Sequence, residues 1–276
     1  MKLIDLLISA IYGIIEGITE WLPISSTGHL ILAERVMPKW SAEYTEMFQV
    51  VIQLGAILAV VVLFFSKLWP LGRDENRAVY IKKPVMSMWG KIIICGIPAG
   101  IAGVFFDDAI ENLFYGESAK TIVVATTLIL YGIAFIFIER LNKKRTPTVT
   151  CMEELSYKQA FIIGLAQTLA IIPGTSRSGS TILGGMLLGT NRASAAEFSF
   201  YLAVPVMAGA SALKLLKFGF SFTLMELAVL LVGMAVSFIV SMIAIRFLMN
   251  FVKKHDFKFF GYYRIALGIF VILNLL

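Results

Sequence analysis

Two carboxylates lie close together in an apolar stretch near the start of the chain. Glu16 and Glu20 are four residues apart, so on a helix they stand on the same face. A charge carried within an apolar segment is costly and is by default a functional hypothesis. The alternative is that both glutamates are solvated near a membrane surface, but the chain returns at once to the apolar Trp21 and Leu22. The pair is therefore predicted to belong to a functional site.

A cluster of hydroxyl side chains and one histidine follows these carboxylates. Ser25, Ser26 and Thr27 precede Gly28 and His29 at a turn that should begin a helix. Backbone N–H groups at a helix N-terminus attract anions. The turn is therefore a candidate anion-binding site, with Ser25 and Thr27 as contacts and Ser26 or His29 as a nucleophile.

A lone arginine occupies a similar break in the second half of the chain. Arg177 lies between Ser176 and Ser178, and a guanidinium binds phosphate through a bidentate fork. A purely structural pairing of Arg177 with a buried glutamate is the alternative. The second histidine, His255, follows two lysines and is expected to be solvated.

Together these groups match the requirements of metal-assisted phosphoryl transfer. A divalent ion held by Glu16 and Glu20 would screen phosphate charge, and Arg177 would stabilise the transition state. Ser26 or His29 would attack phosphorus. The two clusters lie far apart in the chain, so the fold must bring them together.

Composition identifies the setting as a membrane. Of the 276 residues, 58% are hydrophobic and only 15% are charged, whereas soluble domains are about 45–50% apolar and about 25% charged. Mean hydropathy is +0.84. The net charge of +6 comes from blocks between apolar spans, a pattern typical of cytoplasmic loops, so no nucleic-acid partner is expected. Cys95 and Cys151 show neither disulfide nor zinc spacing.

Six apolar spans and two broken segments account for most of the chain. The broken segments, roughly 3–36 and 157–188, are interrupted by Pro-, Gly- and Ser-rich runs, and each half is short for a crossing. They are predicted to be re-entrant helical hairpins. The continuous spans are predicted at about 47–65, 92–106, 121–138, 198–216, 224–245 and 262–276.

The two broken segments match each other at an offset of 151 residues. Ser25 aligns with Ser176, and His29 with Ser180. Each hairpin is followed by three spans, and an odd number of crossings inverts the second copy. We therefore expect an all-α polytopic fold in one integral membrane domain, 1–276. It comprises repeat 1 (about 1–140), a basic cytoplasmic loop (about 141–156) and repeat 2 (about 157–276).

The distribution of charge predicts an orientation. Three basic segments are expected on the cytoplasmic side, and an acidic stretch between the second and third spans is expected outside. Both termini then lie outside, and the two hairpin tips meet within the membrane. The basic residues are Lys67, Arg73, Arg77, Lys82, Lys83, Lys91, Arg140, Lys143, Lys144, Arg145, Lys158, Arg246, Lys253, Lys254, Lys258 and Arg264, and the acidic ones are Asp107, Asp108, Glu111 and Glu117.

Three motifs resemble the signatures of a known family. The run from Glu16 to Leu30, the Pro-Gly-Thr-Ser-Arg-Ser-Gly run at 173–179 and the segment from Arg192 to Phe200 are similar to those of the bacterial undecaprenyl-diphosphate phosphatases, the bacitracin-resistance family. The resemblance covers the whole chain in length and order, and no key residue departs from it.

The resemblance implies an activity and a location. It implies hydrolysis of undecaprenyl diphosphate at the outer face of the bacterial cytoplasmic (inner) membrane, which recycles the carrier lipid for peptidoglycan synthesis. It also implies dependence on Mg²⁺ or Ca²⁺, contact with membrane lipids and a fold that is often homodimeric. Carried over by position, Glu16 and Glu20 serve the metal or proton transfer, Ser26 or His29 is the nucleophile, and Arg177 holds the phosphate.

Two other functions were considered. Inverted repeats with broken helices are also a transporter architecture, so a lipid flippase is the main alternative. Translocation alone needs no candidate nucleophile, which favours the phosphatase. A type-2 phosphatidic-acid phosphatase would need a second histidine near its nucleophile, and His255 lies in a basic loop.

Overall fold

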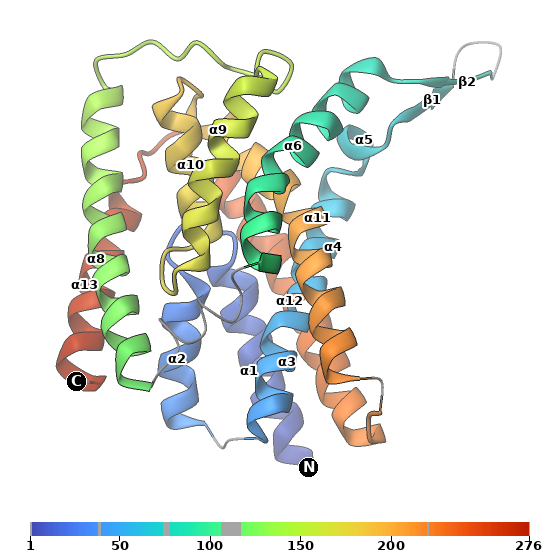
Figure 1. The fold of residues 1–276 in the computed structure, drawn as a ribbon, viewed down its shortest axis with the longest axis vertical. Helices are drawn as coiled ribbons and strands as arrows, with labels where there is room; N and C mark the ends of the chain where they lie inside the picture. The colour runs from blue at the N-terminus through green and yellow to red at the C-terminus, as the bar shows by residue number, and fades with distance from the viewer. Residues whose placement is uncertain (1, 38–39, 74–77, 106–116, 220, 276) are drawn as a thin grey trace.

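The computed structural model is built almost wholly from helices (Figure 1), and it describes residues 2–37, 40–73, 78–105, 117–219 and 221–275. Two short strands, β1 and β2, pair antiparallel with Gly72 opposite Tyr80. The elements are α1 (Leu3–Thr19), α2 (Ser26–Val36), α3 (Ala42–Val51), α4 (Gln53–Leu63), α5 (Phe65–Leu68), β1 (Leu71–Arg73), β2 (Val79–Ile81), α6 (Lys83–Phe105), α8 (Glu117–Asn142), α9 (Tyr157–Thr168), the 3₁₀ turn η1 (Leu169–Ile171), α10 (Arg177–Leu187), α11 (Arg192–Phe218), α12 (Leu224–Phe251) and α13 (Lys258–Leu275).

Five helical stretches in the described part of the chain are long and apolar enough to cross a membrane. They are Ala42–Leu63, Lys83–Phe105, Lys120–Asn142, Arg192–Phe218 and Leu224–Phe251. Each overlaps one of the predicted spans, and the sixth predicted span overlaps α13. The first stretch consists of two consecutive helices, α3 and α4, which a single residue, Ile52, separates. The prediction of an all-α polytopic membrane protein is thus confirmed.

The two broken segments form helical hairpins, as predicted. The first consists of α1 and α2, and the second of α9, η1 and α10. At about 1.5 Å per residue, the 11 residues of α2 or α10 extend about 16 Å, roughly half of a hydrocarbon core. Figure 1 shows α1 and α2 at the lower end, α9 and α10 at the upper end, and both breaks near mid-height.

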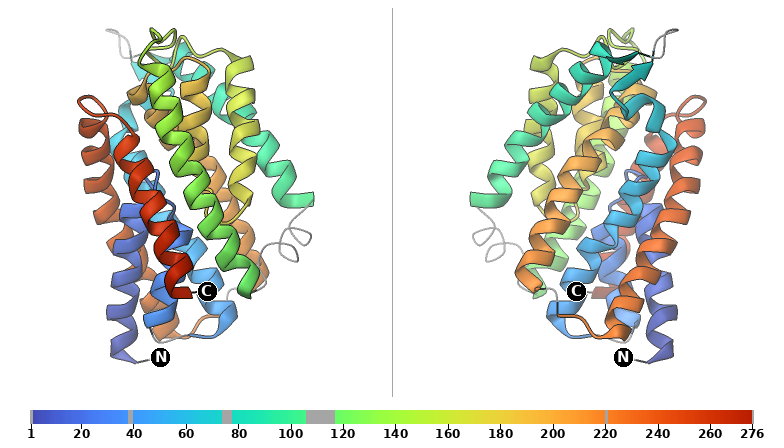
Figure 2. Two further views of the ribbon diagram at one scale, coloured as in Figure 1. Left: turned by 90° about the vertical axis from the view of Figure 1, so that its left-hand side faces the viewer. Right: turned by 90° about the vertical axis from the view of Figure 1, so that its right-hand side faces the viewer.

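Long helices pack in pairs around these hairpins. α1 packs along α12, α9 along α6, and α8 along α13 (Figure 2). Glycines allow the closest approaches: a Cβ on Gly55 of α4 would lie 2.0 Å from the carbonyl oxygen of Met234 in α12. Hairpin helices that are too short to cross the membrane are therefore held by full-length neighbours.

Three connections rich in basic residues lie at one end of the molecule. Figures 1 and 2 show the β1–β2 region and the connections after α8 and after α12 together at the upper end, and both termini at the lower end. In the predicted orientation this upper end would be the cytoplasmic one. The acidic stretch on which that prediction also relied (Asp107, Asp108, Glu111 and Glu117) lies outside the residues whose side chains the structure describes.

Two of the basic residues that were expected in solvated loops are buried within helices. Arg264 lies inside α13 and its side chain is fully buried. Lys91 lies inside α6, is buried, and donates hydrogen bonds to the carbonyl oxygens of Met152 and Glu153. A count of charges between apolar spans could not separate these two from solvated loop residues.

Replacement of Gly55 by alanine should destabilise the fold. The added methyl group would meet the backbone of Met234 in α12, and overpacking of this kind costs about 1–3 kcal/mol. Gly209→Ala is the matched control, because a Cβ there has no neighbour within 4 Å and alanine favours a helix. Thermal unfolding in one detergent should show a lower midpoint for the first variant only. Equal midpoints would contradict the packing described.

Candidate active site

Both hairpin breaks contain a serine in an unusual backbone conformation. Ser25 has φ 73° and Ser176 has φ 72°, and they are the only non-glycine residues with positive φ in the described part of the chain. Each side chain accepts a hydrogen bond from a backbone N–H three residues on, at Gly28 or Gly179. Each serine therefore caps the helix that follows. Such strained positions concentrate at functional sites.

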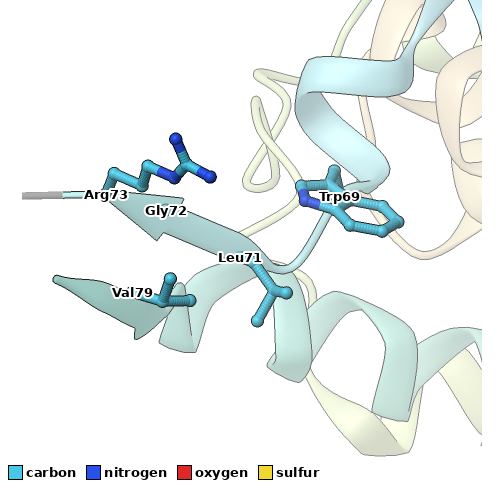
Figure 3. A pocket seen from close by; sticks show the side chains of 5 residues that line it. All are labelled: Trp69, Leu71, Gly72, Arg73 and Val79. Carbon is cyan, nitrogen blue, oxygen red and sulfur yellow. The ribbon is translucent and has the colours of Figure 1, made fainter. Parts of the chain in front are cut away.

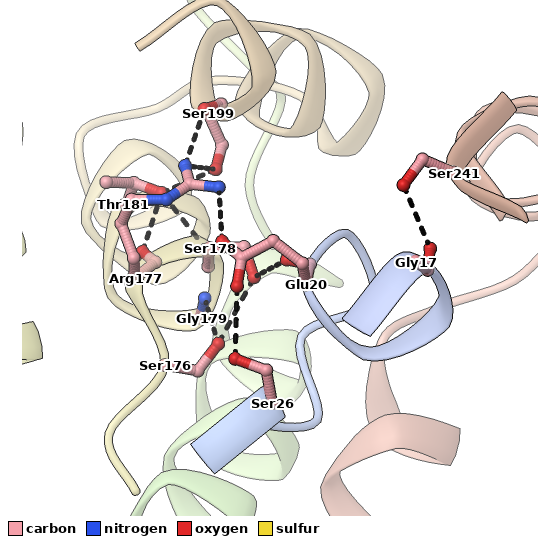
Figure 4. Close-up of polar contacts among 10 residues, drawn as sticks. All are labelled: Gly17, Glu20, Ser26, Ser176, Arg177, Ser178, Gly179, Thr181, Ser199 and Ser241. Atoms are coloured by element: carbon pink, nitrogen blue, oxygen red, sulfur yellow. Dashed lines mark hydrogen bonds and ion pairs between the residues drawn. The ribbon is translucent and has the colours of Figure 1, made fainter. Parts of the chain in front are cut away.

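An ion pair joins the tips of the two hairpins. Arg177 Nη2 lies 2.9 Å from Glu20 Oε1, although 157 residues separate them in the chain. Both side chains are about nine-tenths buried. Figure 4 shows the guanidinium between Glu20 on one side and Ser199 of α11 on the other. Arg177 Nη1 donates to the carbonyl oxygen of Ser199 at 2.8 Å, which fixes the plane of the fork.

Ser26 belongs to the same network. Its Oγ donates to Glu20 Oε2 at 3.0 Å, so one carboxylate contacts both the candidate nucleophile and the arginine (Figure 4). Ser178 Oγ donates to the backbone oxygen of Glu20 at 3.1 Å, and Ser176 Oγ lies 3.1 Å from Ser178 Oγ. The structure thus brings together residues from both predicted clusters.

Glu16 lies outside this network. Its side chain is fully buried, and neither carboxylate oxygen has a hydrogen-bond partner among the described residues. Buried carboxylates without partners are rare, because desolvation of the charge is costly. The two oxygens are therefore available to a proton or a cation.

The His29 side chain contacts α13 and the backbone of Ser25. Its Nδ1 lies 2.7 Å from the carbonyl oxygen of Ser25, and its Nε2 lies 2.7 Å from the hydroxyl of Tyr263. The imidazole and phenol rings are stacked, with centroids 5.7 Å apart. Both ring nitrogens therefore have partners other than Ser26. Thr27 is half-buried in the first turn of α2, and its side chain makes none of the described contacts that join the tips.

Three residues at the site were missed at the sequence level. Ser199 orients Arg177, and Tyr263 contacts His29. Arg264 is fully buried and donates to the carbonyl oxygens of Pro23, Gly174 and Thr175, so it ties the two breaks together. The signal that could have found Arg264 was its position beside Tyr262 and Tyr263 at the start of an apolar span, where an arginine needs a buried partner.

Two surface hollows among the described residues lie away from the hairpin tips. One of about 360 Å³ lies beside β1 and β2, where Trp69, Leu71, Gly72, Arg73 and Val79 line it (Figure 3). It contains a single charged side chain, and in Figure 1 the two strands lie far from the hairpin tips. We therefore place the candidate chemistry at the tips, where carboxylate, hydroxyl and guanidinium groups converge.

Comparison with known proteins supports this choice. The chain is 56% identical to an undecaprenyl-diphosphatase of Acetivibrio thermocellus over 98% of both chains. It is 55% identical to one of Desulfitobacterium hafniense, over 99% of this chain and 97% of the relative. It is 52% identical to one of Enterococcus faecalis, over 99% of this chain and 98% of the relative.

A family model also matches the chain. The family described as bacitracin resistance protein BacA matches residues 9–270, a range that includes both hairpin breaks and every helix of the candidate site. A match of this extent, together with full-length relatives above 50% identity, leaves no part of the site outside the shared region. The chain belongs to the BacA family of bacitracin resistance proteins.

Proposed function

We propose that this membrane protein is an undecaprenyl-diphosphatase, a hydrolase that converts undecaprenyl diphosphate to undecaprenyl phosphate and inorganic phosphate. The full-length relatives carry that name. The observation that carries the proposal is the contact of one carboxylate, Glu20, with both Ser26 and Arg177. The activity recycles a lipid carrier for cell-wall synthesis, and removal of the diphosphate form explains the bacitracin resistance of the family name.

The geometry favours Ser26 over His29 as the nucleophile. Glu20 Oε2 accepts a hydrogen bond from Ser26 Oγ, as a general base does before it takes a proton. Attack of Oγ on the terminal phosphorus breaks the bond to the bridging oxygen, and undecaprenyl phosphate leaves. Water then attacks the phosphoserine, and the protonated Glu20 returns its proton to Oγ as inorganic phosphate leaves.

Arg177 would hold the terminal phosphate during both steps. Its fork is held by the carbonyl oxygen of Ser199, and Glu20 occupies the other side. The carboxylate stands where a phosphate oxygen would bind, so substrate competes with Glu20 for the guanidinium. That competition would free Glu20 to act on Ser26. Electrostatic contacts of this kind usually make the largest contribution to such reactions.

A divalent ion, Mg²⁺ or Ca²⁺, fits the remaining carboxylate. The described residues contain no group of three or more acidic, histidine or cysteine side chains that could hold a metal by themselves. Mg²⁺, however, often takes one or two carboxylates together with phosphate oxygens. Glu16, with two buried oxygens that lack partners, and its neighbour Glu20 would then hold the ion. Bound there, it would screen the charge of the diphosphate.

An inverted repeat explains the architecture. Ser25 and Ser176 share one conformation, and α1 packs on α12 as α9 packs on α6. Ion pairs also cross between the halves in both directions, Glu46 with Lys214 and Glu197 with Lys67. These features support repeat 1 at about 1–140, the loop at about 141–156 and repeat 2 at about 157–276.

The position of the basic connections supports a location in the cytoplasmic membrane. With its basic connections on the cytoplasmic side, the protein would lie in the bacterial cytoplasmic (inner) membrane with both termini outside. The diphosphate would reach the tips from the outer face. A homodimer stays an expectation from the family resemblance.

Purified protein in detergent should release phosphate from undecaprenyl diphosphate when Mg²⁺ or Ca²⁺ is present. Excess EDTA should abolish the release, and Glu16→Gln should raise the metal concentration needed for half-maximal rate. A detergent micelle offers no second compartment, so phosphate release also separates a phosphatase from a lipid flippase. An undiminished rate in EDTA would remove the metal from the mechanism.

Ser26→Ala should lower turnover by at least about 10²-fold, because the attacking oxygen is lost. His29→Ala should retain more activity, since Nε2 contacts Tyr263 and not the Glu20 network. The measurement is kcat for both variants with protein that keeps its thermal midpoint. The reverse ranking would assign the nucleophile to His29.

Arg177→Lys should keep the fold but lose about 10²-fold or more in kcat. An ammonium preserves charge near Glu20 but cannot also hold the carbonyl oxygen of Ser199 in the geometry of the fork. Arg177→Ala should in addition lower the thermal midpoint, because it leaves a buried carboxylate unpaired at a cost of about 3–5 kcal/mol. A folded lysine variant with near-normal turnover would reduce Arg177 to a structural role.

A further inference from the structure

The contacts of His29 determine which ring nitrogen carries hydrogen. The partner of Nδ1 is the carbonyl oxygen of Ser25, which can only accept a hydrogen bond. Nδ1 is therefore protonated, and in the neutral imidazole Nε2 carries the lone pair. The hydroxyl of Tyr263 then donates to Nε2 at 2.7 Å.

Two different segments hold the ring in this state. Ser25, in its positive-φ conformation, holds one edge from within the first hairpin. Tyr263 holds the opposite edge from α13, 234 residues away, and stacks its ring parallel to the imidazole. Tyr263 is 40% exposed, so the residue whose hydroxyl donates to Nε2 lies at an accessible edge of the site.

The second hairpin contains a contact that corresponds to the one between His29 and Tyr263, but without a histidine. Ser180, which aligns with His29 at the offset of 151, donates from its Oγ to the hydroxyl of Tyr131 at 3.1 Å. Tyr131 lies in α8, which packs on α13 and precedes the second hairpin. A tyrosine from a long helix thus contacts each hairpin, but only the first hairpin presents a group that can take up a proton at neutral pH.

We propose that Tyr263 is a positioning residue for His29. Its hydroxyl fixes the imidazole with hydrogen on Nδ1 and a lone pair on Nε2. The kinetic part of this inference rests on the proposed function, in which water must lose a proton to attack the phosphoserine. His29 lies three residues after Ser26, on the same face of α2. As the new O–P bond forms and the P–Oγ bond breaks, the Tyr263 oxygen takes a proton from the water and gives its own proton to Nε2, and His29 later releases that proton to solvent.

The structural part can be tested without any assay of activity. The chain has two histidines, so His255→Gln leaves His29 as the only ¹⁵N-histidine signal. The spectrum should show a protonated Nδ1 and a hydrogen-bonded Nε2. Tyr263→Phe keeps the ring but should move only the Nε2 resonance, toward that of a nitrogen without a donor. Tyr131→Phe, the matched control, should leave both resonances in place.

Kinetics then test whether the contact matters to the reaction. Tyr263→Phe should lower kcat by about 10-fold, a part of the 10²–10⁴-fold that general acid–base catalysis contributes, with KM within about twofold and an unchanged thermal midpoint. In a His29→Ala background the same change should have no further effect, because Tyr263 acts through His29.

Either of two results would overturn the inference. An Nε2 resonance that is the same with Tyr263 and with Phe would remove the contact itself. Losses in kcat that multiply independently in the double variant would show that Tyr263 does not act through His29. If the unmodified protein released no phosphate at all, the proposed function would fail, while the ¹⁵N spectra would still decide whether Tyr263 fixes the imidazole.

Discussion

The rest of the site depends on the ion pair between Arg177 and Glu20. Each group comes from a helix break that would not be stable by itself. Without its partner, each would also be a costly unpaired charge at membrane depth. Their contact satisfies both charges and brings Ser26 into the same network. In the proposed mechanism this ion pair would open, because a phosphate would replace the carboxylate at the guanidinium with similar geometry.

Arg264 supplies the rigidity that this arrangement needs. A break in a helix leaves carbonyl oxygens without intrahelical donors, and such groups are costly away from water. The Arg264 guanidinium donates to carbonyl oxygens of both breaks, and its charge lies over the ring of Tyr131 at 5.3 Å. One side chain from α13 thus satisfies backbone groups in both hairpins and fixes the distance between them.

The helices and their breaks could be predicted from the sequence, but the partners of particular side chains could not. The breaks were predicted because proline, glycine and serine interrupt otherwise apolar helices, and the meeting of the two hairpin tips was predicted from the paired breaks and the alternation of charge. The partner of His29 could not be predicted, since the direction of its ring depends on the conformation of Ser25 and on a tyrosine 234 residues away. Arg264 was missed for a different reason: a loop arginine and a buried one have the same formal charge.

The separation of Glu20 and Arg177 in the chain also governs how the protein is made. At about 5–20 residues per second, the 157 residues between them take on the order of ten seconds to synthesise. During that interval the first hairpin carries its carboxylates with no cation to meet them. The ion pair between the two hairpin tips can therefore form only late in biogenesis, after the second hairpin has been synthesised.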